Sequence, residues 1–221
     1  MLSSAKKEFI TFMETEGILT FGDFTTKSGR KSPYFINTGN YRTGAQLSKL
    51  GEFYASVIKQ TLKDDFTALF GPAYKGIPLA AATAISLFER HKINRPYFFN
   101  RKEIKDHGEG GTIIGYKPKD EDKIIIIEDV ITAGTAVREV MPVLESAANV
   151  KITDMFISVD RCEYGTNTKE TATDQIKKEF GIDVHAIVTA KDIRDYLAQD
   201  PRNADHVKKM DEYMREYCAI K

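Results

Sequence analysis

Hydrophobic and polar residues follow two different periods along this chain, and each period predicts a different kind of element. A 3.6-residue spacing of apolar side chains predicts amphipathic helices, at 5–16, 44–62, 76–91, 134–148, 174–180, 191–199 and 203–217. Short apolar runs predict strands buried on both faces, at 67–70, 97–100, 123–127, 152–159 and 184–188. Alternating strands and helices are typical of an α/β fold in which helices cover both faces of a central parallel sheet.

The two ends of the chain do not follow this alternation. Aromatic and threonine residues around the turn sequence KSGRKSP predict a hairpin of short strands within 19–41. Together with the helix before it, this hairpin is expected to form a small N-terminal hood over 1–42. The parallel α/β core is expected over 43–200 and a docking helix over 201–221. The apolar stripe of that helix consists of Val207, Met210, Met214 and Tyr217.

Two residues fit their predicted helices poorly. Gly51 lies inside 44–62, where glycine costs about 1 kcal/mol relative to alanine, so we expect it to serve close packing. Pro142 lies inside 134–148, where it should remove a backbone hydrogen bond or kink the helix.

Composition narrows the class of protein. The 221 residues are 42% hydrophobic and 29% charged, which is typical of a globular protein in water. Lys plus Arg and Asp plus Glu number 32 each, so the overall charge favours neither nucleic acid nor an anionic membrane as a partner. No apolar run approaches the ~20 residues that span a bilayer.

Targeting and redox signals are equally sparse. Lys6 and Lys7 interrupt the N-terminus where a signal peptide needs an apolar run. The two cysteines, Cys162 and Cys218, form neither a metal-type spacing nor a disulfide framework. These features lead us to expect a reducing, cytoplasmic compartment.

The most informative segment is Lys123–Arg138, KIIIIEDVITAGTAVR. Its apolar run ends in two adjacent carboxylates, Glu128 and Asp129, and Thr132–Ala136 then opens a helix. In open parallel sheets, ligands bind beyond the carboxyl ends of the strands, and a helix N-terminus favours a phosphate. Carboxylates beside a phosphate would repel it unless they faced donors such as vicinal ribose hydroxyls. The segment therefore predicts a loop that binds phosphorylated ribose.

A plainer interpretation of this segment is also open. Asp129 or Thr132 would then merely cap the helix, and Glu128 would face solvent. The segment is neither a Walker loop nor a dinucleotide fingerprint, because the chain contains no GxxxxGK[ST] and no GxGxxG.

The segment resembles the phosphoribosyl-pyrophosphate (PRPP) motif of the type I phosphoribosyltransferases. Further segments are similar, in the same order, to orotate phosphoribosyltransferases: FGDFTTKSGRKSPYFIN, GPAYKGIPLA, NRKEIKDHGEGG, SVDR and AIVTAKDIRDYL. The resemblance runs from Phe21 to Leu197. It implies the type I phosphoribosyltransferase fold and transfer of the phosphoribosyl group from PRPP to orotate. It also implies Mg²⁺, held mainly by PRPP and water, with no protein ligand.

The resemblance implies that the PRPP site draws on three segments. Lys75 would bind pyrophosphate with the turn at Tyr74–Gly76, where Gly71 and Gly76 suit a tight anion-binding turn. The charged loop 101–111 would close over the pyrophosphate of a neighbouring subunit, which implies a homodimer. The implied PRPP residues are Tyr74, Lys75, Arg101, Lys102, Lys105, His107, Glu128, Asp129, Val130, Ile131, Thr132, Ala133, Gly134, Thr135 and Ala136.

Five of these residues would lie at the leaving group and are the catalytic candidates: Lys75, Arg101, Lys102, Lys105 and His107. Cations at that point would stabilise the negative charge that grows on departing pyrophosphate. The alternative for loop 101–111 is a solvated charged turn without a role in the reaction.

The base pocket follows from the same resemblance. Orotate carries a carboxylate, so its pocket needs cations and an apolar wall; the implied residues are Lys27, Phe35, Ile36, Thr132 and Arg161. Three of them have a plainer alternative. Phe35 could be hairpin core, Arg161 could pair with Asp160, and Lys27 could be a surface charge like Arg30 and Lys31.

Two residues depart from the family pattern. Glu128 stands where many orotate enzymes carry Asp, and Ile36 stands where a second aromatic residue is frequent, which leaves Phe35 to stack on the base.

Two other functions compete with the orotate reaction. A purine or uracil phosphoribosyltransferase would not need Lys27 and Arg161, because neutral bases carry no carboxylate. A PRPP-sensing regulator that binds nucleic acid would need a basic face or a helix-turn-helix unit, and the balanced charge provides neither.

Overall fold

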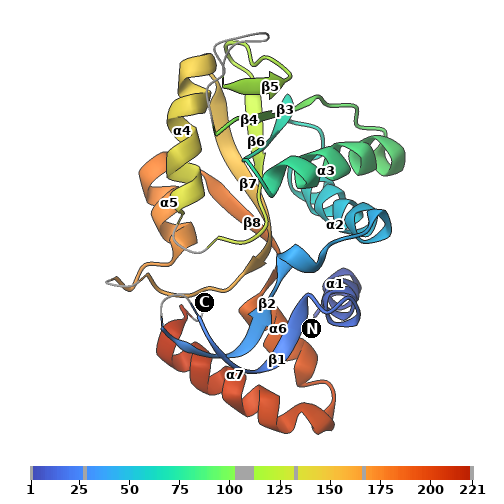
Figure 1. Cartoon of the computed structure of the whole chain (residues 1–221), viewed down its shortest axis with the longest axis vertical. Coiled ribbons are helices and arrows are strands. Elements are labelled where there is room, and N and C mark those ends of the chain that lie inside the picture. The colour runs from blue at the N-terminus through green and yellow to red at the C-terminus, as the bar shows by residue number, and fades with distance from the viewer. Residues whose placement is uncertain (1, 27–28, 103–111, 132–133, 166–167, 220–221) are drawn as a thin grey trace.

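A central sheet with helices on both faces organises the molecule, as the computed structural model of the chain shows in Figure 1. The structure describes residues 2–26, 29–102, 112–131, 134–165 and 168–219. The sheet has six strands in the order β5-β4-β3-β6-β7-β8. They are β3 (Ala68–Gly71), β4 (Tyr97–Asn100), β5 (Ile113–Gly115), β6 (Lys123–Ile127), β7 (Lys151–Asp160) and β8 (Asp183–Thr189).

A separate hairpin and a set of helices complete the fold. The hairpin consists of β1 (Leu19–Thr25) and β2 (Lys31–Ile36). One 3₁₀ turn, Thr38–Asn40, follows the hairpin, and another, Pro201–Asn203, lies between α6 and α7. The helices are α1 (Ser4–Thr15), α2 (Gly44–Leu62), α3 (Gly76–His91), α4 (Thr135–Ala147), α5 (Ala172–Phe180), α6 (Ala190–Leu197) and α7 (Ala204–Tyr217).

The predicted α/β architecture is confirmed, with one strand added. Every predicted helix and strand is present, with its ends within a residue or two of the expected positions. The added strand, β5, pairs antiparallel with β4 at the sheet edge, so the sheet is mainly rather than wholly parallel. The three residues of β5 are too few to show an alternation of apolar and polar side chains, so the sequence did not predict this strand. Pro142 removes one backbone hydrogen bond, as expected, but α4 continues through this exposed residue, where water can satisfy the carbonyl left without a donor.

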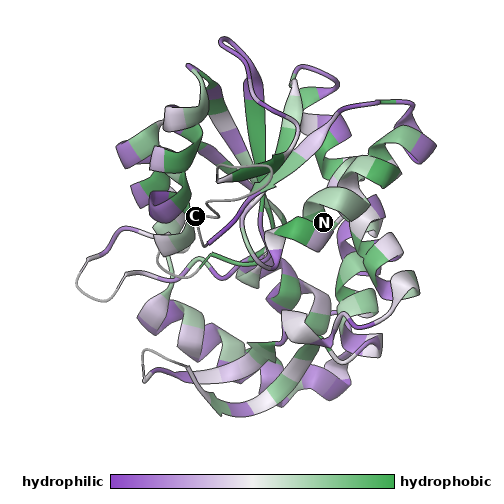
Figure 2. Ribbon diagram, turned by 45° about the horizontal axis from the view of Figure 1, so that its top comes forward, coloured by the Kyte–Doolittle hydropathy of each residue, from purple (hydrophilic) through white to green (hydrophobic). Residues whose placement is uncertain are grey.

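The isoleucine run of β6 explains why helices cover both faces. Successive side chains of a strand point to opposite sides. Ile125 and Ile127 pack in one hydrophobic cluster with α1, α2 and α3, whereas Ile124 and Ile126 pack in a second cluster with α4 and α5. Figure 2 shows the sheet as an apolar layer between helices with polar outer faces.

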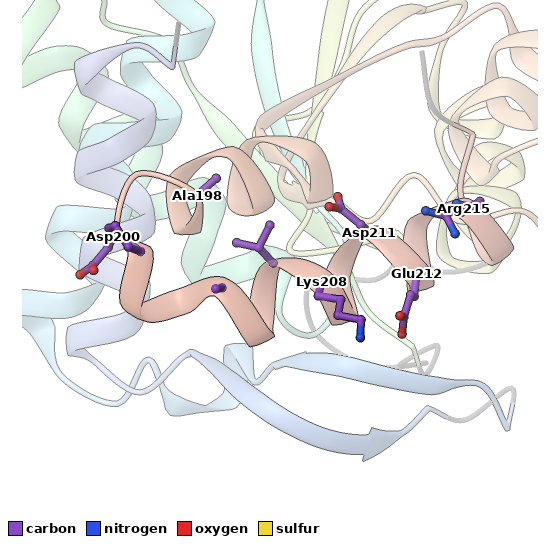
Figure 3. Close-up of a pocket in the computed structure, with 9 residues that line it drawn as sticks. Ala198, Asp200, Lys208, Asp211, Glu212 and Arg215 are labelled. Carbon is purple, nitrogen blue, oxygen red and sulfur yellow. The ribbon is translucent and has the colours of Figure 1, made fainter.

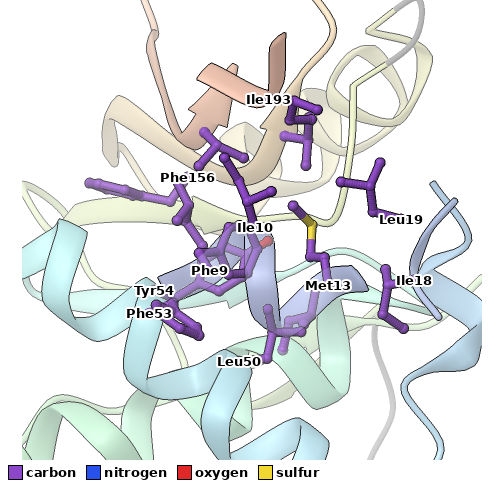
Figure 4. Packing of buried hydrophobic residues seen from close by; sticks show 14 of the residues in the cluster. Phe9, Ile10, Met13, Ile18, Leu19, Leu50, Phe53, Tyr54, Phe156 and Ile193 are labelled. Atoms are coloured by element: carbon purple, nitrogen blue, oxygen red, sulfur yellow. The ribbon is translucent and has the colours of Figure 1, made fainter. Parts of the chain in front are cut away.

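The hood is tied to the core through α1. Figure 4 shows Phe9, Ile10 and Met13 of α1 among Leu50, Phe53 and Tyr54 of α2, Phe156 of β7 and Ile193 of α6. The predicted stripe of α7 also docks, since Met210 and Met214 are buried and Val207 and Tyr217 pack against the same cluster. The division into 1–42, 43–200 and 201–221 stays a prediction. Within the described residues, no helix is long and apolar enough to cross a membrane.

Gly51 lets α2 and α3 approach closely, as its position inside a helix suggested. A Cβ atom added there would lie 2.6 Å from the carbonyl oxygen of Ala82 and 2.9 Å from Oγ of Ser86. The backbones of the two helices therefore approach each other at a point where only glycine fits.

We predict that Gly51→Ala lowers the free energy of unfolding by about 1–3 kcal/mol, because the overpacked methyl group outweighs the gain in helix propensity. Gly44→Ala in the same helix is the matched control, since nothing lies within 4 Å of its added Cβ. Urea unfolding of both variants measures the difference. Equal stability of Gly51→Ala and wild type would refute the close-packing role.

Candidate active site

The centre of the sheet is a topological switch point. From β3 the chain continues to β4 and β5 on one side, whereas from β6 it continues to β7 and β8 on the other. The loops that follow β3 and β6 therefore diverge and leave a crevice at the carboxyl ends of the two strands, where ligands of open α/β sheets bind.

The turn after β3 presses against the end of β6. A Cβ atom on Gly71 would lie 2.2 Å from the carbonyl oxygen of Gly76, and one on Gly76 would lie 2.9 Å from that of Ile127. The side chain of Asn100 supports the turn from β4, because its Oδ1 accepts a hydrogen bond from the backbone N–H of Ala73 at 2.9 Å. The expected tight turn is thus present, and close contact explains both glycines.

Lys75 and Asp129 meet across the crevice. Nζ of Lys75 lies 2.9 Å from Oδ2 of Asp129, and the Thr38 hydroxyl donates to the same oxygen at 2.7 Å. Burial raises the pKa of Asp129, but the bonds from Thr38 and Lys75 outweigh it and hold that pKa below its usual value. Thr38, which was not predicted, follows the hairpin, so the hood contributes a side chain to the site.

Glu128 differs from its neighbour because it is buried. Its side chain does not face solvent: the residue is 9% exposed, and Oε1 accepts a hydrogen bond from the backbone N–H of Asp129 at 2.9 Å. Burial, with the charge of Asp129 beside it, raises the pKa of Glu128 to about 7. Near neutral pH, Glu128 is therefore partly protonated while Asp129 stays ionised, and Glu128 can either donate or accept a hydrogen bond.

The start of α4 is open to an anion. Gly134, at φ 70°, precedes the helix, and among the described residues no side chain caps the first turn. Asp129 instead accepts from the backbone N–H of Val130 at 2.7 Å, so the capping interpretation of Asp129 is wrong. Unpaired N–H groups at a helix N-terminus favour a phosphate. Thr132 and Ala133, which belong to the same prediction, lie outside the described residues.

These groups line one cavity of about 330 Å³. Its walls consist of Ala73, Tyr74, Lys75, Glu128, Asp129, Val130, Ile131, Gly134, Thr135, Ala136, Val137, Glu139 and Met155. Every described residue of the predicted PRPP site lines it except Arg101 and Lys102. Val137, Glu139 and Met155 were not predicted, because their place depends on how α4 and β7 pack.

The charged loop begins beside this cavity. The backbone N–H of Arg101 donates to the carbonyl oxygen of Thr112 at 2.7 Å, and Nζ of Lys102 lies 5.5 Å from the ring centre of Tyr74. A cation over an aromatic face is attracted by it, so Lys102 is held against the turn that carries Lys75. Lys105 and His107 lie outside the described residues.

The predicted base-binding residues have distinct surroundings. Phe35 is 45% exposed and stacks on Phe24 at 5.5 Å between ring centres, so the hairpin-core interpretation of Phe35 is wrong. Ile36 is half-buried against the core, and Lys27 lies outside the described residues. Nε of Arg161 pairs with Glu163 at 2.5 Å, and its guanidinium lies 4.3 Å from the ring centre of Tyr34.

A second, larger hollow of about 470 Å³ lies beside α7, away from these residues (Figure 3). Its walls come from the end of α6, the following turn and α7, and the charged side chains Lys208, Asp211, Glu212 and Arg215 mix both signs. None of the predicted site residues belongs to it. The volume of a cavity alone would therefore not have identified the cavity that contains the predicted PRPP residues.

We predict that the free energy of unfolding falls as the pH rises from 4.5 to about 7, because Glu128 ionises less readily in the folded protein. The pKa of Glu128 rises from an ordinary 4.5 to about 7 on folding, so the folded protein favours the protonated side chain. The resulting contribution to stability is complete below pH 4.5 and is lost as the pH passes 7. Glu128→Gln keeps a neutral side chain throughout. Its unfolding free energy relative to wild type should rise by on the order of 2–3 kcal/mol between pH 5 and 8 in urea titrations. A difference that stays constant with pH would contradict the assignment.

Comparison with known proteins agrees with this geometry. The phosphoribosyl transferase domain model matches residues 37–192. Orotate phosphoribosyltransferase from Clostridium beijerinckii is 50% identical over 224 residues, which cover 99% of this chain and 100% of that protein. The protein of the same name from Pseudomonas putida is 47% identical over 212 residues, 96% of this chain and 97% of its own.

A solved structure extends the similarity to three dimensions. The crystal structure of orotate phosphoribosyltransferase from Francisella tularensis aligns with a TM-score of 0.87 at 38% identity, covering 96% of this chain and 100% of that one. Similarity at this identity over nearly the whole length shows the family, not the fold alone. The chain belongs to the orotate phosphoribosyltransferases, enzymes of the type I phosphoribosyltransferase family.

Proposed function

We propose that this enzyme transfers the 5-phosphoribosyl group from PRPP to orotate, giving orotidine 5′-monophosphate and pyrophosphate, through the residues of the cavity between β3 and β6. The observation that carries this proposal is that one cavity of about 330 Å³ brings together a cation, two acids and a helix start that begins at Gly134. PRPP presents one group to match each: pyrophosphate, ribose hydroxyls and a 5-phosphate.

PRPP would bind by replacing contacts that the chain makes with itself. Lys75 and Asp129 are paired at 2.9 Å, and each has a stronger partner on the substrate. The pyrophosphate accepts from Lys75, while the ribose hydroxyls donate to Asp129 and Glu128. The 5-phosphate accepts from backbone N–H groups at Gly134–Ala136, where small residues let the backbone approach.

Transfer then depends on charge placement. The ribose gains positive character at C1, and negative charge grows on pyrophosphate. Lys75, Arg101 and Lys102 would stabilise the leaving group, together with Lys105 and His107 of the loop outside the described residues. The carboxylate of Asp129 holds the ribose from the opposite side, so that both reactants are positioned before the bond breaks.

Orotate would be held by its ring and its carboxylate. The exposed ring of Phe35 offers the apolar wall, with Ile36 beside it in the chain. Burial lowers the pKa of Arg161, but the nearby Tyr34 and Glu163 raise it by more. The guanidinium therefore stays charged at any working pH. Lys27 and Thr132 complete the set that the resemblance implies.

The site suits Mg²⁺ that is held mainly by substrate. Among the described residues no cluster of three His, Cys, Asp or Glu side chains is placed to hold a metal, but Glu128 and Asp129 offer carboxylate oxygens at the cavity. Mg²⁺ in such sites takes one or two carboxylates at most and completes its shell with phosphate oxygens and water. When bound, it would neutralise charge on the pyrophosphate.

Exposed apolar side chains on α3 and β4, two elements in contact with each other, support the proposed homodimer. Ile85 and Phe88 of α3 are 58% and 53% exposed, and Tyr97 of β4 is 40% exposed. Large apolar side chains gathered on a surface mark protein contacts. β4 leads from Tyr97 directly into Arg101, so a second subunit on this patch would receive loop 101–111 near its own cavity.

A reducing, cytoplasmic compartment completes the proposal. Cys162 and Cys218 are both free thiols. Burial raises the pKa of each to about 12, so neither is a reactive thiolate at neutral pH.

The function is tested by mixing the enzyme with orotate, PRPP and Mg²⁺ and following the loss of orotate absorbance. We expect turnover that requires both PRPP and Mg²⁺ and stops when the metal is chelated. Adenine, hypoxanthine and uracil serve as competing substrates. Turnover of one of these bases without turnover of orotate would overturn the proposal.

The shared loop is tested with two inactive variants. Lys105→Ala should lower kcat by ~10²–10³, the effect of losing one charge-stabilising donor, and Asp129→Asn should impair PRPP binding. Randomly mixed subunits form hybrid dimers with one intact site, so about a quarter of wild-type activity should return. If hybrids form, as mass spectrometry can verify, and activity does not return, each subunit holds a complete site.

A further inference from the structure

Arg161 is held by side chains from three separate parts of the chain. Its Nε donates to Oε1 of Glu163 at 2.5 Å, and its Nη2 donates to the hydroxyls of Ser32 at 3.1 Å and Tyr213 at 3.2 Å. The face of the guanidinium lies 4.3 Å from the ring centre of Tyr34. Contacts on this scale, with the side chain 13% exposed, fix the plane of the guanidinium.

These contacts leave one nitrogen of Arg161 for a ligand. A guanidinium has five N–H groups: one on Nε and two on each terminal nitrogen. Glu163 takes the first, while Ser32 and Tyr213 take both N–H groups of Nη2. Among the residues that the structure describes, none accepts a hydrogen bond from Nη1. Its two donors are therefore the ones available to a carboxylate.

Tyr213 connects this arrangement to the C-terminal helix. Its hydroxyl donates to Oε1 of Glu163 at 2.6 Å while accepting from Nη2 of Arg161. The residue is buried on α7, which packs along the β1–β2 hairpin (Figure 1). The ring of Tyr213 meets that of Tyr34 edge-on at 6.1 Å. The Tyr213 hydroxyl thus holds both partners of the ion pair, the Glu163 carboxylate and the Arg161 guanidinium.

Glu163 also sets the local charge. Its Oε1 pairs with Arg161, and its Oε2 lies 3.3 Å from Nη1 of Arg30. The Arg30 guanidinium lies 5.2 Å from the ring centre of Tyr217, also on α7. Glu163 thus offsets part of the positive charge of the two guanidiniums, Arg30 and Arg161.

We propose that Glu163 and Tyr213 are positioning residues that orient Arg161, so that the C-terminal helix sets the affinity for the carboxylated base. The inference rests on the proposed function, in which Arg161 receives the orotate carboxylate. It adds that this selectivity depends on residues that would not touch the substrate. Removing either one frees the guanidinium to rotate and turns Nη1 away from the base.

Tyr213→Phe is the sharpest test, because it deletes the hydroxyl and keeps the ring that packs on Tyr34. Loss of one such hydrogen bond should raise KM for orotate by about three- to tenfold and leave kcat and KM for PRPP within about twofold. Tyr196→Phe is the matched control: it removes a hydroxyl bonded to Thr11 at 3.0 Å on the α1–α6 side, and both KM values should stay unchanged.

Glu163→Gln provides a second measurement, at a residue outside α7. It keeps the shape but removes the charge, and KM for orotate should rise by about tenfold or more with KM for PRPP again unchanged. An unchanged KM for orotate in either soluble variant would overturn the positioning role. Equal rises in both KM values, with a lowered melting temperature, would overturn it too, as they indicate general loosening. Absence of orotate turnover in wild type would instead reject the proposed function.

Discussion

The backbone contact between the turn after β3 and the end of β6 is the constraint on which the site depends. Gly71 and Gly76 have no room for a side chain, because carbonyl oxygens of Gly76 and Ile127 lie where a Cβ atom would be. This contact brings Lys75 from one loop to within 2.9 Å of Asp129 from the other. A cation and an acid therefore meet at the point where the chain direction diverges, and both line the cavity that we propose binds a charged, phosphorylated sugar.

Burial gives the neighbouring acids Glu128 and Asp129 different pKa values. Side chains from near both ends of the chain also contact the predicted site residues. Glu128 and Asp129 are adjacent, yet burial raises the pKa of Glu128 to about 7 while Thr38 and Lys75 keep that of Asp129 below its usual value. Thr38 comes from the segment after the hairpin. At the base side, Tyr213 of α7 and Glu163 hold Arg161. The hood and the C-terminal helix thus supply side chains that contact Asp129 and Arg161, in addition to covering the core.

The sequence predicted what depends on local pattern. Period and apolar runs located the helices and strands, and the order of acids, small residues and helix start in Lys123–Arg138 located the cavity. Contacts between distant segments could not be predicted in the same way. Thr38 and Tyr213 carry no local signal, because their roles arise when the hairpin and α7 pack against the core. Glu163, two residues after Arg161, was the one missed partner with a local signal.

A crystal structure with orotidine 5′-monophosphate would test the account most directly, because the product carries the phosphate, the ribose and the carboxylated base together. The account predicts the phosphate at the backbone of Gly134–Ala136, the ribose hydroxyls on Asp129 and the base carboxylate on Nη1 of Arg161. Product bound with its phosphate away from the start of α4, or with its base carboxylate away from Arg161, would contradict it.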